Sequence, residues 1–296
     1  MAALLDITNN KTVSWLKEKL RSLTAGDNED LVFFLETGNT FHTPHYFKFH
    51  SPLANPDLFK TQFIQHCMDE VNVIGVSGAS STRPKAPAFI HLSPLASSWS
   101  NLKTIVPNML HLGVIGYPFI NPGPVGGLTS PPQVPDVELY TRWWQLATFL
   151  PQLHFVTPPS AYKGTWMDIS PVKKRLADLR STVVNPALVV CAKEAMERSL
   201  PVIRPLWMLN PTDPVSQRID DQFMVGDSIL VAPVLEEGQK TRNIYLPNAR
   251  EEKVVWVRGT DRKYWSGGQW LNNTRIELDE VMWFERRREG DRPGTN

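Results

Sequence analysis

Leu110-His-Leu-Gly-Val-Ile-Gly-Tyr-Pro-Phe-Ile-Asn-Pro-Gly-Pro-Val-Gly-Gly127 is the stretch of sequence that decides the fold. Its apolar run, Val114–Ile120, leads directly into a loop of proline and glycine, a pattern typical of a strand buried in a parallel sheet. In a parallel α/β barrel, the loop after such a strand faces the active site. We therefore predict that residues 121–128 form part of a binding face.

This predicted face is poor in acidic side chains. No Asp or Glu occurs between Glu70 and Asp136. If the chain is a barrel enzyme, two consecutive strand ends therefore supply no carboxylate.

Composition excludes several classes of protein. Hydrophobic residues make up 42% of the 296 residues and charged residues 21%, which indicates a globular chain long enough for one large domain or two ordinary ones. The 31 basic and 30 acidic residues nearly cancel, so no basic stripe suggests a nucleic acid or an anionic membrane as partner. Cys67 and Cys191 give neither a disulfide framework nor metal-ligand spacing, and we expect free core thiols and no cofactor.

Neither a signal peptide nor a transmembrane segment is expected. The first six residues carry no basic region of the kind that opens a signal peptide. Residues 104–135 carry no charge, but prolines and glycines interrupt them throughout, whereas a spanning helix needs about 20 uninterrupted apolar residues.

Strand and helix patterns alternate along the first three quarters of the chain, which predicts a parallel sheet with crossover helices. Apolar runs predict strands at Ala3–Thr8, Leu31–Leu35, Val71–Val76, Ala88–Leu92, Val202–Trp207 and, more weakly, Leu153–Val156. Helical spacing predicts helices at Asn10–Leu23, Asp57–Glu70, Leu102–Leu112, Asp136–Leu150 and Lys173–Ser199, the last broken at Asn185-Pro186. With the stretch quoted above, this gives six or seven strands, fewer than the eight of a complete (β/α)8 barrel.

The pattern changes after about Gly226. Short apolar segments separated by Gly, Pro and Asn predict a small antiparallel β domain. Its predicted strands are Ile229–Val234, Asn243–Leu246, Lys253–Val257, Arg262–Trp265 and Met282–Phe284. We therefore predict an α/β fold, with an incomplete TIM barrel over residues 1–226 and a sandwich-like β domain over residues 227–296.

Four ordered blocks carry a resemblance to a known family. They are Gly113–Gly127, Glu138-Leu-Tyr-Thr-Arg-Trp143, Pro201-Val-Ile-Arg-Pro-Leu-Trp207 and Asp221–Val234. These blocks resemble family 31 glycoside hydrolases, most closely the branch of the myogenesis-regulating glycosidase and the SITS-binding protein. The resemblance implies a (β/α)8 barrel, of which this chain would hold the second half, and retaining hydrolysis of α-glycosidic bonds. It also implies a membrane-anchored lumenal form, whose anchor is absent from this chain.

The family's nucleophile motif aligns with Phe33-Phe-Leu-Glu-Thr-Gly-Asn39. The resemblance places Glu36 at the nucleophile position, where the family has Asp, and Phe34 where the family has Lys. The longer side chain moves the carboxylate by about 1 Å, and a displacement of that size can cost about 100-fold in rate.

The family's acid/base motif aligns with Ser97-Ser-Trp-Ser-Asn101, which places Ser100 at the position of the catalytic acid. A serine hydroxyl has no useful acidity near pH 7, so the resemblance implies that this half of the mechanism is lost. His91 stands where relatives have an arginine, and an imidazole can in principle shuttle a proton.

The family's loop after the quoted stretch carries an Asp that holds a sugar hydroxyl. Here Gly123 takes the place of that Asp, and Leu128 takes the place of a nearby Asn. A site built to hydrogen-bond a sugar loses much of its affinity for the sugar when such polar groups are lost.

Four further side chains are candidates to line a binding cleft: Trp99, His154, Arg204 and Trp207. Aromatic faces stack on sugar rings, and arginine binds carboxylate, phosphate or sulfonate through two parallel hydrogen bonds.

Three hypotheses follow. The first is a glycosidase-like protein without hydrolytic activity that keeps a cleft for a carbohydrate or an anionic small molecule such as a stilbene disulfonate. The second is an active retaining α-glycosidase that uses Glu36 as nucleophile and takes its acid from elsewhere. The third is a truncated isoform without independent function.

Overall fold

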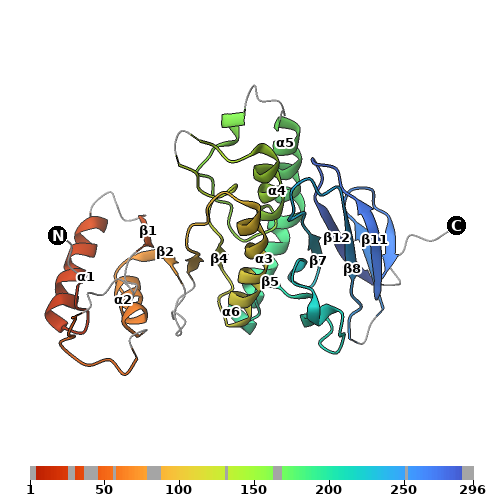
Figure 1. Cartoon of the computed structure of the whole chain (residues 1–296). Helices are drawn as coiled ribbons and strands as arrows, with labels where there is room; N and C mark the ends of the chain where they lie inside the picture. Colours follow the sequence, from red (N-terminus) through yellow and green to blue (C-terminus); the bar gives the residue numbers. More distant parts are fainter. Residues whose placement is uncertain are drawn as a thin grey trace. The chain divides into compact units, whose positions relative to one another are not determined.

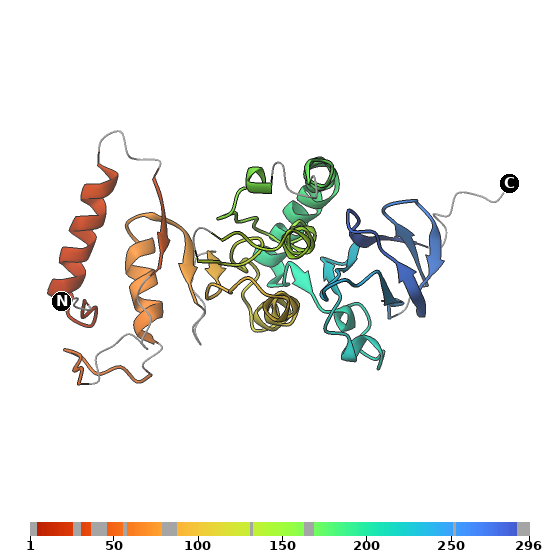
Figure 2. The same cartoon turned by 45° about the horizontal axis from the view of Figure 1, so that its top comes forward.

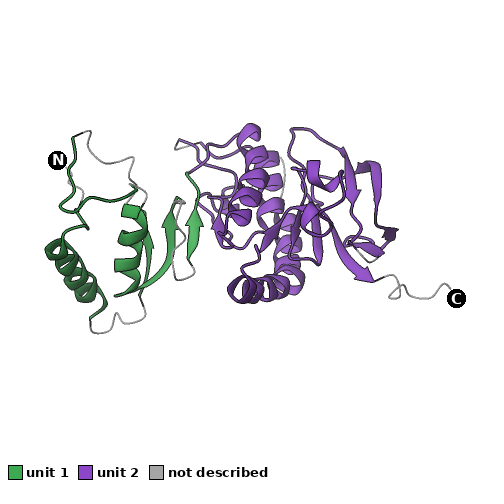
Figure 3. Cartoon of the chain, turned by 90° about the horizontal axis from the view of Figure 1, so that it is seen from below, with its two compact units in different colours: residues 1–93 green, residues 94–296 purple. Residues whose placement is uncertain are grey.

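The computed structural model of the chain describes residues 5–25, 31–36, 46–55, 58–78, 88–130, 133–162, 169–250 and 253–288. The chain divides into two compact units, residues 1–93 and residues 94–296 (Figure 3). The division expected after residue 226 stays a prediction.

The first unit combines two helices with a parallel sheet whose strands lie in the order β1-β2-β3 (Figure 1). Its elements are α1 (Asn10–Thr24), β1 (Val32–Leu35), α2 (Leu58–Met68), β2 (Asn72–Ser77) and β3 (Phe89–His91). The three strands and both helices agree with the apolar patterns. The strand predicted at Ala3–Thr8 is wrong in its described part, because residues 5–9 form a turn that leads into α1.

Both helices pack against the sheet through one apolar cluster (Figure 2). Leu16 and Leu20 of α1 meet Cys67 of α2, and side chains of β1 and β2 cover them: Phe33, Leu35 and Val73. The residue before α1, Asn9, caps the helix by accepting a hydrogen bond from the backbone N–H of Lys11 at 3.0 Å.

A buried lysine ties α2 to the end of β2. Lys60 shares the inner stripe of α2 with Ile64 and Cys67, at the i, i+4, i+7 spacing, and its side chain is 4% exposed. Its Nζ donates a hydrogen bond to the carbonyl oxygen of Ser77. Burial lowers the pKa of the Lys60 ammonium to about 8.

The second unit begins with helices. They are α3 (Trp99–Val114), α4 (Val137–Ala147), α5 (Ser170–Leu179) and α6 (Asn185–Arg198), with the short strand β4 (Ile120–Asn121), the 3₁₀ turn η3 (Pro159–Tyr162) and the π-helical turn η4 (Arg180–Val184). No helix in the described part of the chain is long and apolar enough to cross a membrane.

The quoted stretch was expected to be a strand from Val114, and that expectation is wrong for its first half. Val114 is the last residue of α3, and only Ile120–Asn121 is extended. The helix ends because Gly116 adopts a φ of +104°, which lets the N–H of Tyr117 reach back to the carbonyl of Leu112 at 2.9 Å. Val114 and Ile115 are consequently about half exposed.

Two other predictions in this region need correction. Leu153–Val156 forms no strand. Two helices are present as predicted, and α6 begins at Asn185, but they are not separated by a break, because the π-helical turn Arg180–Val184 joins α5 directly to α6.

The C-terminal part of the second unit holds two antiparallel sheets (Figure 1). Six strands lie in the order β10-β9-β12-β7-β6-β5, and β11 pairs with β8. Their bounds are β5 (Ile203–Arg204), β6 (Phe223–Val225), β7 (Ile229–Ala232), β8 (Thr241–Leu246), β9 (Val254–Arg258), β10 (Tyr264–Ser266), β11 (Gln269–Arg275) and β12 (Met282–Arg288), with 3₁₀ turns η5 (Leu206–Met208) and η6 (Ser216–Arg218).

The strand predicted at Val202–Trp207 is only two residues long, and it pairs antiparallel and not within a parallel barrel sheet. Ile203 and Arg204 pair antiparallel with Val225 and Met224 of β6. The strands β6 and β11 were not predicted, because β6 is fully buried and only three residues long, while β11 is mostly polar and exposed.

Helix α4 is buried on nearly every side, although its sequence is amphipathic (Figure 1). Its polar residues bind the turn between β11 and β12. Arg142 donates from Nη1 to the carbonyl oxygens of Glu277 and Glu280, each at 3.0 Å, and Gln145 donates to the carbonyl of Leu278 at 2.7 Å. The guanidinium of Arg142 is 2% exposed, and burial lowers its pKa to about 10.

We therefore predict that replacing Arg142 lowers the stability of the second unit. The variant Arg142→Met keeps the apolar stem of the side chain but leaves the Glu277 and Glu280 carbonyls without their donor. We expect a loss of about 3 kcal/mol in the free energy of unfolding. Urea unfolding followed by tryptophan fluorescence measures it, and the exposed control Arg218→Met is expected to change by less than about 0.5 kcal/mol. Equal losses in both variants would contradict this role of Arg142.

Lys60 predicts a pH dependence of stability. The pKa of Lys60 is about 8 in the folded chain against 10.5 for an ordinary lysine, so the unfolded chain binds more protons between these two values. Stability contributed by this group therefore rises from pH 8 to pH 10.5, by up to about 3 kcal/mol.

The measurement compares unfolding free energies of the parent and of Lys60→Met at pH 7.5 and pH 10. The difference between the two proteins is expected to change with pH, whereas the exposed control Lys11→Met should follow the parent at both values. A pH-independent difference for Lys60→Met would refute the lowered pKa.

Candidate functional site

Glu36 directly follows the last residue of β1, and its side chain is exposed. The backbone carbonyl of Glu36 accepts a hydrogen bond from the Ser77 hydroxyl at 2.5 Å. Since Lys60 donates to the carbonyl of the same Ser77, two hydrogen bonds join α2, β2 and the end of β1. Sequence reasoning missed Lys60, although a lysine within the apolar stripe of a helix was a detectable signal.

His91 ends β3 at the same edge of this sheet. The parallel register pairs Ser77 with His91, and the N–H of Gly78 donates to the His91 carbonyl at 2.7 Å. The ring of Phe34 meets the half-buried imidazole of His91 edge-on, with 5.4 Å between ring centroids. Phe34 therefore makes an aromatic packing contact at this edge of the sheet.

Ser100 lies in the first turn of α3 and is exposed. Ser98 caps this helix by accepting from the backbone N–H of Asn101 at 3.2 Å. The hydroxyls of Ser98 and Ser100 lie 3.0 Å apart, within hydrogen-bonding distance. The preceding residue, Trp99, is half-buried.

The loop after β4 is held firmly by its backbone. The N–H of Val125 donates to the carbonyl of His154 at 2.8 Å. Leu128 exchanges two backbone hydrogen bonds with the segment before α3: its N–H donates to Leu95 at 2.8 Å, and its carbonyl accepts from Ser97 at 2.9 Å. Within the second unit, the loop thereby connects His154 with the start of the helix that carries Trp99 and Ser100.

The glycines of this loop differ in the space around them. A Cβ at Gly126 would lie 2.7 Å from the ring of Tyr140, so close packing requires glycine there. Gly123 has a φ of +97°, but a Cβ built on it meets nothing within 4 Å. Its N–H donates to the side-chain oxygen of Asn121 at 2.9 Å, so Gly123 lies in a turn with open space beside it.

Arg204 is 2% exposed and its guanidinium is engaged on every edge. Nη1 pairs with Asp227 at 2.6 Å, Nη2 pairs with Glu194, and Nε donates to the carbonyl of Pro201 at 2.8 Å. Burial alone would lower its pKa, but the hydrogen bonds to the two carboxylates raise it overall. These contacts make Arg204 an internal ion-pair residue and give no support to the expected role in binding an anion.

The structure thus brings together some of the predicted site residues and separates others. Glu36 and His91 belong to the first unit, and the other six belong to the second. Trp207 lies half-buried in η5, the turn that follows β5. Cys67 and Cys191 are both free and buried, and burial raises the pKa of each thiol to about 11. Among the described residues, no three His, Cys, Asp or Glu side chains gather as a metal site.

Two profiles of one family match the chain. The profile of the glycosyl hydrolases family 31 TIM-barrel domain matches residues 87–181, and that of the glycosyl hydrolase family 31 C-terminal domain matches residues 199–287. A crystal structure of a GH31 α-xylosidase from a soil metagenome, complexed with xylose, superimposes on 96% of this chain with a TM-score of 0.73. That chain is 22% identical over the match and is covered to 46% of its length, so it supports the fold alone.

Two curated relatives match almost the whole chain. The SITS-binding protein of Tetronarce californica is 35% identical over 97% of this chain, and the myogenesis-regulating glycosidase of Mus musculus is 30% identical over 96% of it. The chain spans about two fifths of the length of either relative, 40% in both cases. The profiles, the relatives and the fold agree with the four sequence blocks, and the chain belongs to glycoside hydrolase family 31.

Proposed function

We propose that this chain is a family 31 protein that does not hydrolyse glycosides and that keeps its old cleft for binding a ligand. The observation that carries the proposal is Ser100, which stands at the position of the catalytic acid. Its hydroxyl lies in the exposed first turn of α3 beside another serine.

Retaining glycosidases need two carboxyl groups about 5–5.5 Å apart, one to attack the sugar and one to protonate the leaving oxygen and then activate water. A hydroxyl cannot perform the second task near neutral pH. The chain has no Asp or Glu between Glu70 and Asp136, so the loops after β2 and β3 supply no replacement acid. Asp136, at the end of the loop after β4, caps α4 by accepting hydrogen bonds from the N–H groups of Glu138 and Leu139.

The side of the cleft that we expect to bind sugar has also lost polar side chains. Gly123 offers no side chain to a sugar hydroxyl, and Leu128 is apolar. The loop backbone is nevertheless held by the same kind of close packing that a binding face requires, through Gly126 and the Val125–His154 hydrogen bond. This combination favours a preformed cleft over a catalytic one.

The ligand that we propose for this cleft is a carbohydrate or an anionic small molecule, bound beside Trp99, His154 or Trp207. One relative is named for binding SITS, and a structure with the same fold is complexed with xylose. Arg204 is not included, because Glu194 and Asp227 already occupy its guanidinium.

A second candidate is an active retaining α-glycosidase with Glu36 as nucleophile. The supporting observation is the position of Glu36 immediately after β1, where the Lys60 and Ser77 hydrogen bonds tie the ends of β1 and β2 together. In this reading the acid comes from a part of the protein outside the described residues.

The two candidates are separated by α-glucosyl fluoride and intact-mass spectrometry of the purified chain. Fluoride needs little acid assistance to leave, so this substrate isolates the nucleophile from the acid. We expect no turnover: either the mass is unchanged, or one sugar equivalent is added and remains, because no base activates water to release it.

The matched variants are Glu36→Gln and, as a control for loss of one negative charge, Glu18→Gln on the exposed face of α1. A persistent adduct that is absent only in Glu36→Gln would show a working nucleophile without its partner. Continuous release of glucose that depends on Glu36 would contradict the proposal and establish the second candidate.

A further inference from the structure

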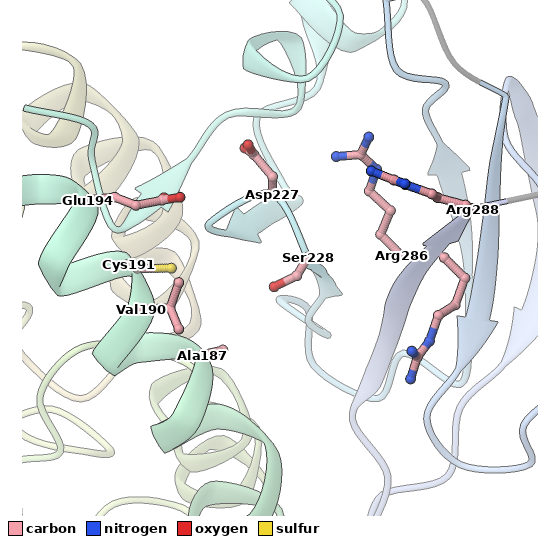
Figure 4. A pocket seen from close by; sticks show the side chains of 9 residues that line it. Ala187, Val190, Cys191, Glu194, Asp227, Ser228, Arg286 and Arg288 are labelled. Atoms are coloured by element: carbon pink, nitrogen blue, oxygen red, sulfur yellow. The ribbon is translucent and has the colours of Figure 1, made fainter. Parts of the chain in front are cut away.

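Cavities of the second unit differ in the side chains that line them. One of about 610 Å³ lies between α6 and the end of β12, and charged residues such as Glu194, Asp227 and Arg288 line it (Figure 4). Another, of about 390 Å³, lies between α5 and the six-stranded sheet, and apolar side chains form much of its wall. We call this smaller cavity the α5 cavity.

The wall of the α5 cavity comes from a helix and from the end of two neighbouring strands. Leu176 and Leu179 of α5 border it on one side, and Val281 and Trp283, at the start of β12, border it on the other. Leu176, Val281 and Trp283 are buried, and Leu179 is half-buried. A volume of about 390 Å³ lies within the range of about 300–1,000 Å³ that is typical of pockets for small organic molecules.

The pleat of β12 turns Trp283 toward this cavity. Side chains alternate along a strand, and Met282 and Phe284 pack in the core cluster that β12 shares with β8. Val281 and Trp283 therefore face the other side of the sheet. On that side the indole ring of Trp283 meets the buried ring of Phe149, with 6.3 Å between the ring centroids.

The indole N–H of Trp283 is a hydrogen-bond donor that the protein leaves without an acceptor. The ring lies over Gly259, which also borders the cavity, and a Cβ at Gly259 would clash with Cε2 and Nε1 of the indole. Among the described residues, no group accepts a hydrogen bond from this N–H, and the N–H is not sealed from solvent. Because a tryptophan N–H in a largely buried ring usually has a partner, its position indicates a ligand that carries an acceptor.

The charged residues that line the α5 cavity in the described part of the chain already have charged neighbours. Arg175 pairs with Asp279 at 2.9 Å and also donates to the Asp279 carbonyl at 2.9 Å. Glu280 stabilises the charge of the buried Arg142 guanidinium and so raises the pKa that burial lowers. A charged ligand would lose its hydration here without gaining a free partner, which favours an uncharged one.

We propose that the α5 cavity binds a small uncharged aromatic molecule, of one or two fused rings, whose oxygen or nitrogen accepts a hydrogen bond from the indole N–H of Trp283. The rings lie against Leu176, Leu179 and Val281 and meet the indole of Trp283, since aromatic pairs favour such contacts. The site uses none of the residues of the cleft in the proposed function and does not depend on that function.

Isothermal titration of the purified chain with two compounds of matched shape tests the proposal. The compounds are 1-indanone and indane, which differ by one carbonyl oxygen in place of two hydrogens. We expect one molecule of either to bind per chain, with 1-indanone about fivefold tighter because its carbonyl accepts the indole hydrogen bond. Equal affinities of the two compounds would overturn the role of the N–H.

A third compound tests the preference for an uncharged ligand. Indane-2-carboxylate is expected to bind at least about tenfold more weakly than indane, because its carboxylate loses water and finds no free partner. Binding of the carboxylate as tight as that of indane would overturn the assignment of an uncharged ligand.

The first pair of variants tests the hydrogen bond. Trp283→Phe keeps an aromatic ring but removes the N–H, so the variant is expected to bind 1-indanone and indane equally. Trp270→Phe makes the same change on β11, at a position that is 41% exposed and does not line the cavity, and should keep the preference for 1-indanone. A preference that persists in the folded Trp283→Phe variant would overturn the hydrogen bond.

The second pair locates the site without changing Trp283. Leu179→Trp fills the cavity with a larger apolar side chain and is expected to weaken binding of both compounds by at least about tenfold. Ala177→Trp adds the same side chain at an exposed position of α5 that does not line the cavity, and it should leave binding unchanged. No binding of either compound by the parent chain would overturn the proposal, and so would undiminished binding by the folded Leu179→Trp variant.

Discussion

The second unit depends on the hydrogen bonds of a buried positive charge, the Arg142 guanidinium, to backbone carbonyls and to the side chain of Gln145. Arg142 projects from α4, a helix buried on nearly every side, and donates to the carbonyls of Glu277 and Glu280. A buried cation is costly unless its hydrogen bonds are satisfied, so the turn between β11 and β12 must stay where those carbonyls point at α4. Gln145 adds a second contact to the same turn. These contacts join the helical part of the unit to its antiparallel sheets.

In the candidate site as well, contacts that hold the backbone in place are made by different residues from those expected to carry the chemistry. Gly126 packs against Tyr140, and Val125 binds the backbone of the segment that carries His154, so the loop after β4 keeps a defined shape. We propose that the side chains that would act on a sugar are changed instead, at Glu36, Ser100 and Gly123. Packing and catalysis place different demands on a sequence, and the proposed function is a loss of catalytic side chains with the packing kept.

Much of the architecture was predictable, because local pattern and packing agree. The strands β1, β2 and β3 lie where short apolar runs placed them, and the helices α2 and α4 follow apolar spacing. The errors arise because the same local pattern is compatible with more than one structure. The apolar run from Val114 to Ile120 contains the end of a helix and the start of a strand, and its composition alone does not show where one ends and the other begins. Ile203–Arg204 reads as a barrel strand until its antiparallel pairing with β6 is seen, and pairing partners are a property of the folded chain.

For the site, the sequence predicts positions, and the contacts around them could not be predicted. Glu36, Ser100 and Gly123 stay predictions from the family resemblance, whereas the engagement of Arg204 by Glu194 and Asp227 depends on residues 10 and 23 positions away.

The measurement that tests the central claim most directly is hydrolysis of an unactivated α-linked disaccharide, such as maltose, by the purified chain between pH 4 and pH 8. The account predicts no glucose above the buffer background at any pH. Glucose release that saturates with substrate and disappears in the Glu36→Gln variant would contradict it.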